Sequence, residues 1–130
     1  MKRLISCLIV LAMGLSAAGS EATLIQSRQM LIKGLQDGNL GLKCDAIFRM
    51  AEIKSCYPDL KIPELERALK KAFKHETNPL VKTYAGLTLI YITDPSIYKN
   101  IQVVAKENSI DFYQRLQKTI YQNTLAFQSE

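Results

Sequence analysis

Residues 78–92 read NPLVKTYAGLTLIYI, and this stretch predicts how the rest of the chain must pack. Asn78 is suited to cap a helix N-terminus, and Pro79 is suited to the first helical position. The helix that follows is apolar almost all the way round, and a helical wheel leaves only a narrow strip for water: Lys82, Gly86 and Thr93. A helix with this pattern is buried by neighbours on several sides.

Hydrophobic periodicity predicts six helices and no strand. The expected ranges are 22–36, 40–54, 63–75, 78–92, 95–107 and 109–127. Pro63 opens the third helix, Asp94 and Pro95 separate the fourth from the fifth, and Ser109 caps the sixth. The sixth helix is expected to turn these apolar residues inward: Ile110, Tyr113, Leu116, Ile120 and Leu125.

The chain contains an internal repeat. Residues 39–53 read NLGLKCDAIFRMAEI, and they match residues 78–92 at an offset of 39 residues. The windows share a capping asparagine, a lysine, an alanine and a series of apolar positions; upstream, Leu31 and Leu35 match Leu69 and Phe73 with one residue of adjustment. A period of this length, made of helix, turn and helix, is typical of an α-solenoid, because one hairpin cannot bury its own apolar face.

The second window resembles the second helix of HEAT-like repeats, which carries a capping Asn or Asp, a proline, a Val-Arg pair, an alanine, a leucine and a closing Asp. The matching residues are Asn78, Pro79, Val81, Lys82, Ala85, Leu89 and Asp94. The first window matches less fully, since it lacks the proline, and both windows carry lysine in place of arginine. The chain resembles short exported bacterial HEAT-repeat proteins of undefined role. This resemblance implies an all-α fold, a short α-solenoid of about three helical hairpins.

The N-terminus has the order of a secretory signal peptide. Lys2 and Arg3 give a positive start, residues 4–15 are apolar, and small residues follow. Cleavage after Ala18 and cleavage after Ser20 fit equally well. We therefore expect a cleaved signal peptide and a periplasmic or secreted protein.

Residues 1–20 form this expected signal peptide, and residues 21–130 form a single helical domain of about 110 residues. Loss of Lys2 and Arg3 lowers the formal charge from +5 to about +3. We expect no nucleic-acid partner, because the dense basic stripe of such proteins is missing. We also expect no stable membrane insertion after cleavage, since the most apolar stretch is short and interrupted by Lys82.

The domain keeps two cysteines, Cys44 and Cys56. An oxidising compartment would permit a disulfide between them. If the helix that holds Cys44 continues to about residue 53, its rise of ~1.5 Å per residue separates the two Cα atoms by more than ~10 Å, whereas a disulfide needs less than ~7 Å. We therefore favour two separate, partly buried thiols over an intramolecular disulfide.

Catalytic chemistry has little support in the sequence. His75 is the only histidine, and a surface position at a helix C-terminus explains it better than a catalytic base. Lys70 and Lys74 follow Glu66 at helical spacing, so a solvated face is favoured over an anion or lipid-headgroup site. No phosphate loop or nucleophile motif occurs. We expect no enzyme, no cofactor and no metal.

Three tyrosines, Tyr84, Tyr91 and Tyr98, admit two interpretations. Packing in the core with hydroxyls at its edge is favoured, since a buried tyrosine hydroxyl needs a partner. The alternative is an aromatic rim around a groove that holds a peptide.

We expect an exported, non-enzymatic protein-interaction module or scaffold. The second helices of stacked hairpins line a concave surface that suits extended or helical protein partners. The expected partner-binding residues are Lys43, Lys82 and Gly86, near Glu52 and Thr93. The alternative is a small-molecule carrier or small enzyme with a pocket lined by tyrosines and His75.

Overall fold

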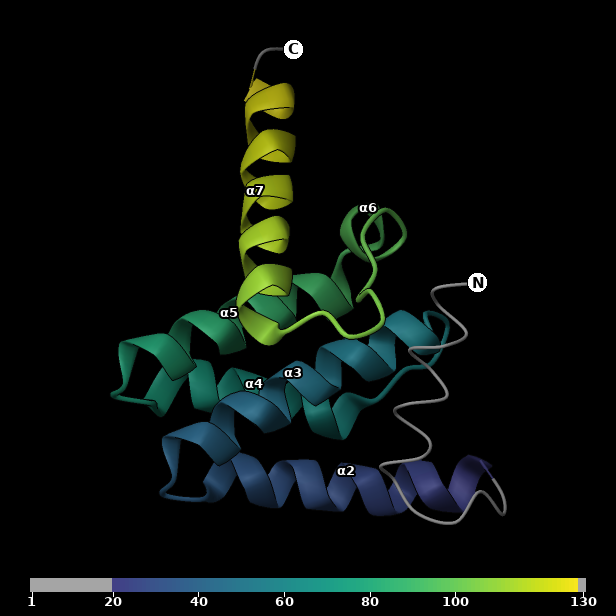
Figure 1. Ribbon diagram of the computed structural model, residues 1–130, viewed down its shortest axis with the longest axis vertical. Helices are drawn as coiled ribbons and strands as arrows, with labels where there is room; N and C mark the ends of the chain where they lie inside the picture. The colour runs from purple at the N-terminus through teal and green to yellow at the C-terminus, as the bar shows by residue number, and fades with distance from the viewer. Residues whose placement is uncertain (1–19, 129–130) are drawn as a thin grey trace.

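The structure is a computed structural model that describes the backbone of residues 20–128 and the side chains of residues 27–125. Residues 1–19 of the expected signal peptide lie outside the described residues. Within the described part, the chain is helical and contains no strand, which confirms the all-α prediction (Figure 1). The helices are α2 (Ser20–Gln36), α3 (Leu40–Cys56), α4 (Pro63–His75), α5 (Pro79–Thr93), α6 (Pro95–Tyr98) and α7 (Ser109–Gln128).

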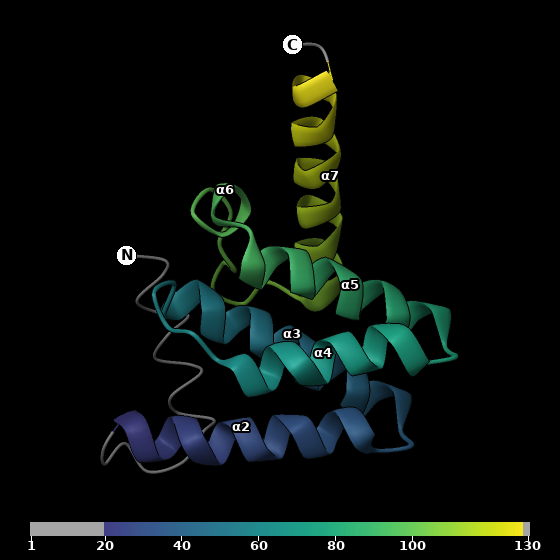
Figure 2. The same cartoon turned by 180° about the vertical axis from the view of Figure 1, so that it is seen from behind.

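Two helical hairpins, α2–α3 and α4–α5, form the body of the molecule (Figures 1 and 2). The hairpins stack with α2 against α4 and α3 against α5, so equivalent helices of the two repeats meet. Both second helices begin with the expected asparagine cap. The side chain of Asn39 accepts the Leu42 N–H at 3.1 Å, and the side chain of Asn78 accepts the Leu80 N–H at 2.9 Å.

The prediction of a helix over residues 95–107 is wrong. Helix α6 ends at Tyr98, and the chain then runs without helix to the start of α7. Ile101 and Val103 alternate as buried residues along this segment, which is the periodicity of an extended chain and not of a helix.

Side chains from distant helices supply the hydrogen bonds that this segment would otherwise make within a helix. The Tyr91 hydroxyl donates to the Ile101 carbonyl at 2.9 Å, and the Val103 N–H donates to Ser55 Oγ at 3.0 Å. The expected third hairpin is therefore not formed within residues 20–128, and the short α-solenoid remains a prediction.

Helix α7 has the expected length but packs over only its first half. Its N-cap is Asn108 and not Ser109, because Asn108 Oδ1 accepts the Asp111 N–H at 2.9 Å. The helix then projects away from the hairpins (Figure 1). Ile110 and Leu125, expected to point inward, are exposed, whereas Tyr113 and Leu116 are buried as expected.

Helix α5 is buried on several sides, as its sequence predicts, because α3, α4, α6 and α7 all pack against it. An aromatic cluster joins it to α7. Tyr84 stacks on Tyr113 with ring centroids 4.2 Å apart, and the edge of Phe112 meets Tyr91 at 5.3 Å. Within this cluster the hydroxyls of Thr88 and Tyr113 share a hydrogen bond of 2.7 Å, and both residues are buried.

We expect Thr88→Val to lower the free energy of unfolding by about 1–3 kcal/mol, because it leaves the buried Tyr113 hydroxyl without its partner. Tyr113→Phe should lower the free energy of unfolding by less, since the Thr88 hydroxyl can turn to the backbone carbonyl one helical turn earlier. The double variant should lose less stability than the sum of the losses in the two single variants. Denaturant unfolding measures all three.

Thr124→Val is the matched control, because the Thr124 hydroxyl donates to the Ile120 carbonyl on an exposed part of α7. Its effect should stay within about 0.5 kcal/mol. Additive losses of stability from Thr88→Val and Tyr113→Phe would contradict the hydrogen bond between these two hydroxyls.

Candidate functional site

Lys43 ties the two hairpins together instead of lying on an exposed strip. Its Nζ lies 2.8 Å from Glu76 Oε2, and the two side chains are only 19% and 14% exposed. Glu76 Oε1 accepts the Asn78 N–H at 3.3 Å. The hydrogen bond from Lys43, followed by that from Asn78, holds the pKa of Glu76 below its usual range. The ion pair thus links α3 to the turn between α4 and α5.

Gly86 and Lys82 lie beside Phe73 on the outer side of the second hairpin. A Cβ atom on Gly86 would come within 2.9 Å of the Phe73 ring, so glycine lets this ring lie against α5. The Lys82 Nζ lies 5.7 Å from the centroid of the same ring, within the range of a cation–π contact. Lys82 is exposed as expected, while Gly86 is half-buried beneath Phe73.

Glu52 and Thr93 do not join this group. Glu52 is buried and lies 3.5 Å from Arg49 within the same helix, and burial raises its pKa. Thr93 is exposed at the far end of α5, where its hydroxyl donates to the Leu89 carbonyl at 2.6 Å. The expected binding strip is therefore split into separate places.

The repeat explains why Lys82 is exposed while its equivalent, Lys43, is paired. At the offset of 39 residues, Lys82 corresponds to Lys43, and Ile90 corresponds to Ala51. Ala51 is fully buried, whereas Ile90 is 39% exposed. The second hairpin thus presents the same face as the first, but without a following hairpin to cover it.

The first helices of the hairpins show the same difference. Phe73 corresponds to Leu35 in the repeat; Leu35 is 8% exposed and Phe73 is 45% exposed. Among the side chains described, no carboxylate forms an ion pair with Lys82, although Glu76 fills this role for Lys43. We call this uncovered surface the open face; its residues are Phe73, Lys82, Gly86 and Ile90.

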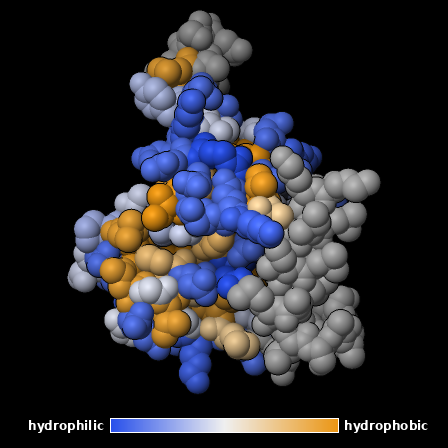
Figure 3. Space-filling model, viewed as in Figure 1, coloured by the Kyte–Doolittle hydropathy of each residue, from blue (hydrophilic) through white to orange (hydrophobic). Residues whose placement is uncertain are grey.

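Further apolar side chains are exposed near the two hairpin turns. Leu40 and Leu42 lie in the first turn of α3, and Leu80 lies in the first turn of α5. Figure 3 shows hydrophobic side chains gathered on the side of the molecule where these turns lie. The sequence pattern predicts that Leu42 and Leu80 are covered, but both are exposed. The pattern fails here because it does not reveal where a helix lacks a neighbour.

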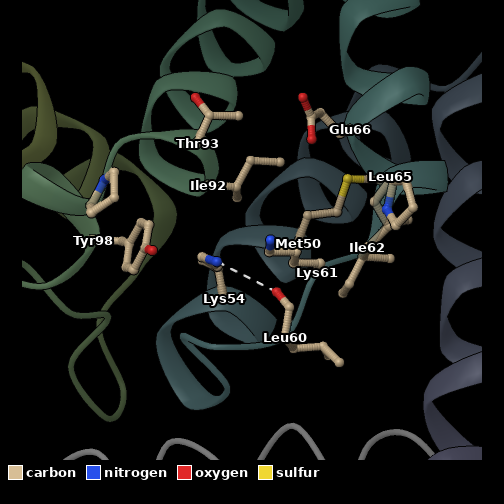
Figure 4. A pocket seen from close by; sticks show the side chains of 12 residues that line it. Met50, Lys54, Leu60, Lys61, Ile62, Leu65, Glu66, Ile92, Thr93 and Tyr98 are labelled. Atoms are coloured by element: carbon tan, nitrogen blue, oxygen red, sulfur yellow. Dashed lines mark hydrogen bonds between the residues drawn. The ribbon is translucent and has the colours of Figure 1, made fainter.

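A cavity of about 590 Å³ lies at the opposite ends of the hairpins (Figure 4). It is formed by the C-terminal half of α3, the loop into α4, the start of α4, the end of α5, and α6. The residues that line it are Met50, Lys54, Leu60, Lys61, Ile62, Pro63, Leu65, Glu66, Ile92, Thr93, Pro95 and Tyr98. Lys54 donates to the Leu60 carbonyl at 3.4 Å and lies 4.1 Å from the centroid of the Tyr98 ring.

The tyrosines and His75 do not line a common pocket. Tyr84 and Tyr91 belong to the core, as the favoured interpretation has it, while Tyr98 is half-buried at the cavity. His75 is exposed at the C-terminal end of α4 and is not among the residues that line the cavity. Beside it on α4, Glu66 and Lys70 form the expected ion pair at 3.2 Å.

Cys44 is a half-buried free thiol, so the disulfide with Cys56 is not formed, in agreement with the favoured interpretation. Burial, with a smaller contribution from Glu76, raises the pKa of Cys44. Its thiol is therefore a weak nucleophile at neutral pH, because the thiolate is the reactive form.

Residues 20–128 contain no helix that combines the length and apolarity needed to cross a membrane. The described side chains also include no cluster of three or more histidine, cysteine or carboxylate groups that could hold a metal ion. Comparisons of the chain with protein-family models, curated proteins and solved structures find no match.

We expect Lys43→Met to raise the pKa of Glu76 toward its usual value. The depressed pKa stabilises the fold at neutral pH, and this contribution is lost as the pH falls through the pKa of Glu76. The stabilities of wild type and Lys43→Met should therefore converge at acid pH. NMR titration of Glu76 and denaturant unfolding at several pH values measure both effects.

Lys82→Met is the control, because the same substitution at the equivalent repeat position removes no ion pair. It should leave the titration of Glu76 unchanged. An unchanged Glu76 pKa in Lys43→Met would contradict the assigned bridge.

Proposed function

We propose that this protein is an exported, non-enzymatic protein-interaction module that binds its partner on the open face. The main support for this proposal is the exposed Phe73 ring, which lies against Gly86 beside the unpaired Lys82. Aromatic side chains on a rigid support dominate the binding energy of many protein interfaces. The support for export is the order of charged, apolar and small residues in residues 1–20.

The contact between the two hairpins suggests what the partner offers. In the first hairpin, Leu35 is buried beside α4, and Lys43 meets a carboxylate from the turn after α4. The open face presents the equivalent residues, so a complementary partner is a helical segment with apolar side chains and one carboxylate for Lys82. The formal positive charge of the chain favours an acidic partner in the same way.

We further propose that the two hairpins are HEAT-like repeats. The support is the stacking of α2 on α4 and of α3 on α5, together with the equivalent asparagine caps. In such arrays each repeat covers the apolar face of its neighbour, and an end repeat without a polar outer face remains available for binding.

The alternative, a small-molecule carrier or small enzyme, would need the tyrosines and His75 around one pocket. Tyr84 and Tyr91 are instead in the core, while His75 is exposed at the end of α4.

The test is capture of partners by cross-linking in the native envelope, with wild type and variants compared quantitatively. Phe73→Ala and Lys82→Glu should each weaken binding of a genuine partner by about tenfold or more, without loss of thermal stability. Reversing the partner's carboxylate to lysine should restore binding to Lys82→Glu. Sedimentation of the purified chain shows whether the partner is a second copy.

Tyr121→Ala and Lys118→Glu are matched controls, because both residues are exposed on α7 and neither is among the α7 residues that line a hollow with Ile90. They should leave binding unchanged. Partners that bind wild type and the Phe73→Ala/Lys82→Glu double variant equally would refute the open face as the binding surface.

A further inference from the structure

The cavity at the ends of the hairpins has the size and lining of a ligand site. Its volume of about 590 Å³ lies within the usual range for small-molecule pockets, about 300–1,000 Å³. Apolar side chains from α3, α4, α5 and the loop between α3 and α4 contribute to its wall: Met50, Leu60, Ile62, Leu65 and Ile92. Met50 and Leu65 are almost fully buried, so they belong to the packed core beneath the cavity.

Lys54 places a positive charge against this apolar wall. Its ammonium donates one long hydrogen bond to the Leu60 carbonyl and lies over the Tyr98 ring (Figure 4). An ammonium group has three donors, so these two contacts leave it able to donate to a ligand. The ion pairs of the described residues do not include Lys54, and burial lowers its pKa.

The charges around Lys54 leave the cavity favourable for an anion. Asp59 and Glu66 act on Lys54 from a distance and oppose the effect of burial, while Lys61 adds a second positive charge on the cavity wall. Glu66 is already paired with Lys70 at 3.2 Å, which offsets much of its charge. A buried or half-buried cation gains most from a partner of opposite charge when water is excluded.

The first turn of α4 adds to this field. Ile62 stands at its N-cap position without a side-chain cap, and Pro63 occupies the first helical position. Both residues line the cavity. Helix N-termini favour negative charge. This contribution is secondary, because the cavity and Lys54 already define the site.

We propose that this cavity binds a small organic anion with an aliphatic body, of the class of medium-chain carboxylates, with the carboxylate on Lys54 and the chain against Met50, Ile62 and Ile92. An aliphatic body matches the wall, in which Tyr98 is the single aromatic residue and is already covered by Lys54. The site is distinct from the open face and does not depend on the proposed protein partner.

The test compares decanoate, decanol and decylamine as probes in methyl NMR spectra of the purified chain. Decanoate should shift the methyl resonances of Met50, Ile62 and Ile92 and bind about tenfold or more tightly than decanol, because its charge meets Lys54. Decylamine should bind more weakly than decanol. Equal binding of the three probes, or unchanged cavity methyls, would overturn the proposal.

Lys54→Met keeps most of the apolar stem and removes the charge, so it should abolish the preference for decanoate over decanol while decanol still binds. Lys118→Met, on the exposed surface of α7, should preserve the preference. A preference that survives Lys54→Met overturns the role of Lys54. If Lys54→Met does not fold, as judged by circular dichroism, the comparison of the three probes on wild type decides whether the cavity prefers an anion.

The same spectra distinguish other occupants of the cavity. Shifts of the cavity methyls that depend on protein concentration without any probe would mean that a second copy fills the cavity, and would overturn the proposal.

Discussion

Burial of α5 between the first hairpin and α7 is the constraint on which the rest of the structure depends. This helix is apolar on nearly every side, so neither its own hairpin nor the first hairpin alone can cover it. The aromatic cluster around Tyr84 and Tyr113 completes the cover, and the Thr88–Tyr113 hydrogen bond satisfies the polar groups that this burial traps. Burial raises the pKa of Tyr113 far above its usual range, so its hydroxyl keeps its proton.

Equivalent residues of the two repeat units differ in exposure because the stack ends after the second hairpin. In the first unit, Lys43 pairs with Glu76 and Ala51 is covered. In the second unit, the equivalent Lys82 and Ile90 meet solvent, since the chain continues into α6 and α7 and not into a further hairpin on that side. The surface that joins the two hairpins at one level is thus exposed at the next, where we propose that a partner binds.

The segment between α6 and α7 shows how tertiary contacts override local preference. Ile97, Ile101 and Val104 have helical spacing, and the sequence pattern predicted a helix from them. Ile101 and Val103, the pair that is buried, have the spacing of an extended chain. The hydroxyls of Tyr91 and Ser55 decide between them, because they supply hydrogen bonds to backbone groups that a helix would otherwise satisfy. Arg115 adds to this by donating to the Gln102 carbonyl at 2.7 Å and pairing with Glu107.

Local chemistry in the sequence determined the five long helices, the asparagine and proline starts of α3, α4 and α5, and the two equivalent hairpins, because caps, turns and apolar periodicity act between residues close in the chain. Only the tertiary structure decided that Lys43 is paired while Lys82 is exposed, that Phe73 covers Gly86, and that Lys54 faces a cavity. These features depend on residues far apart in the chain and on where the stack stops, and neither is encoded in the pattern of a single helix.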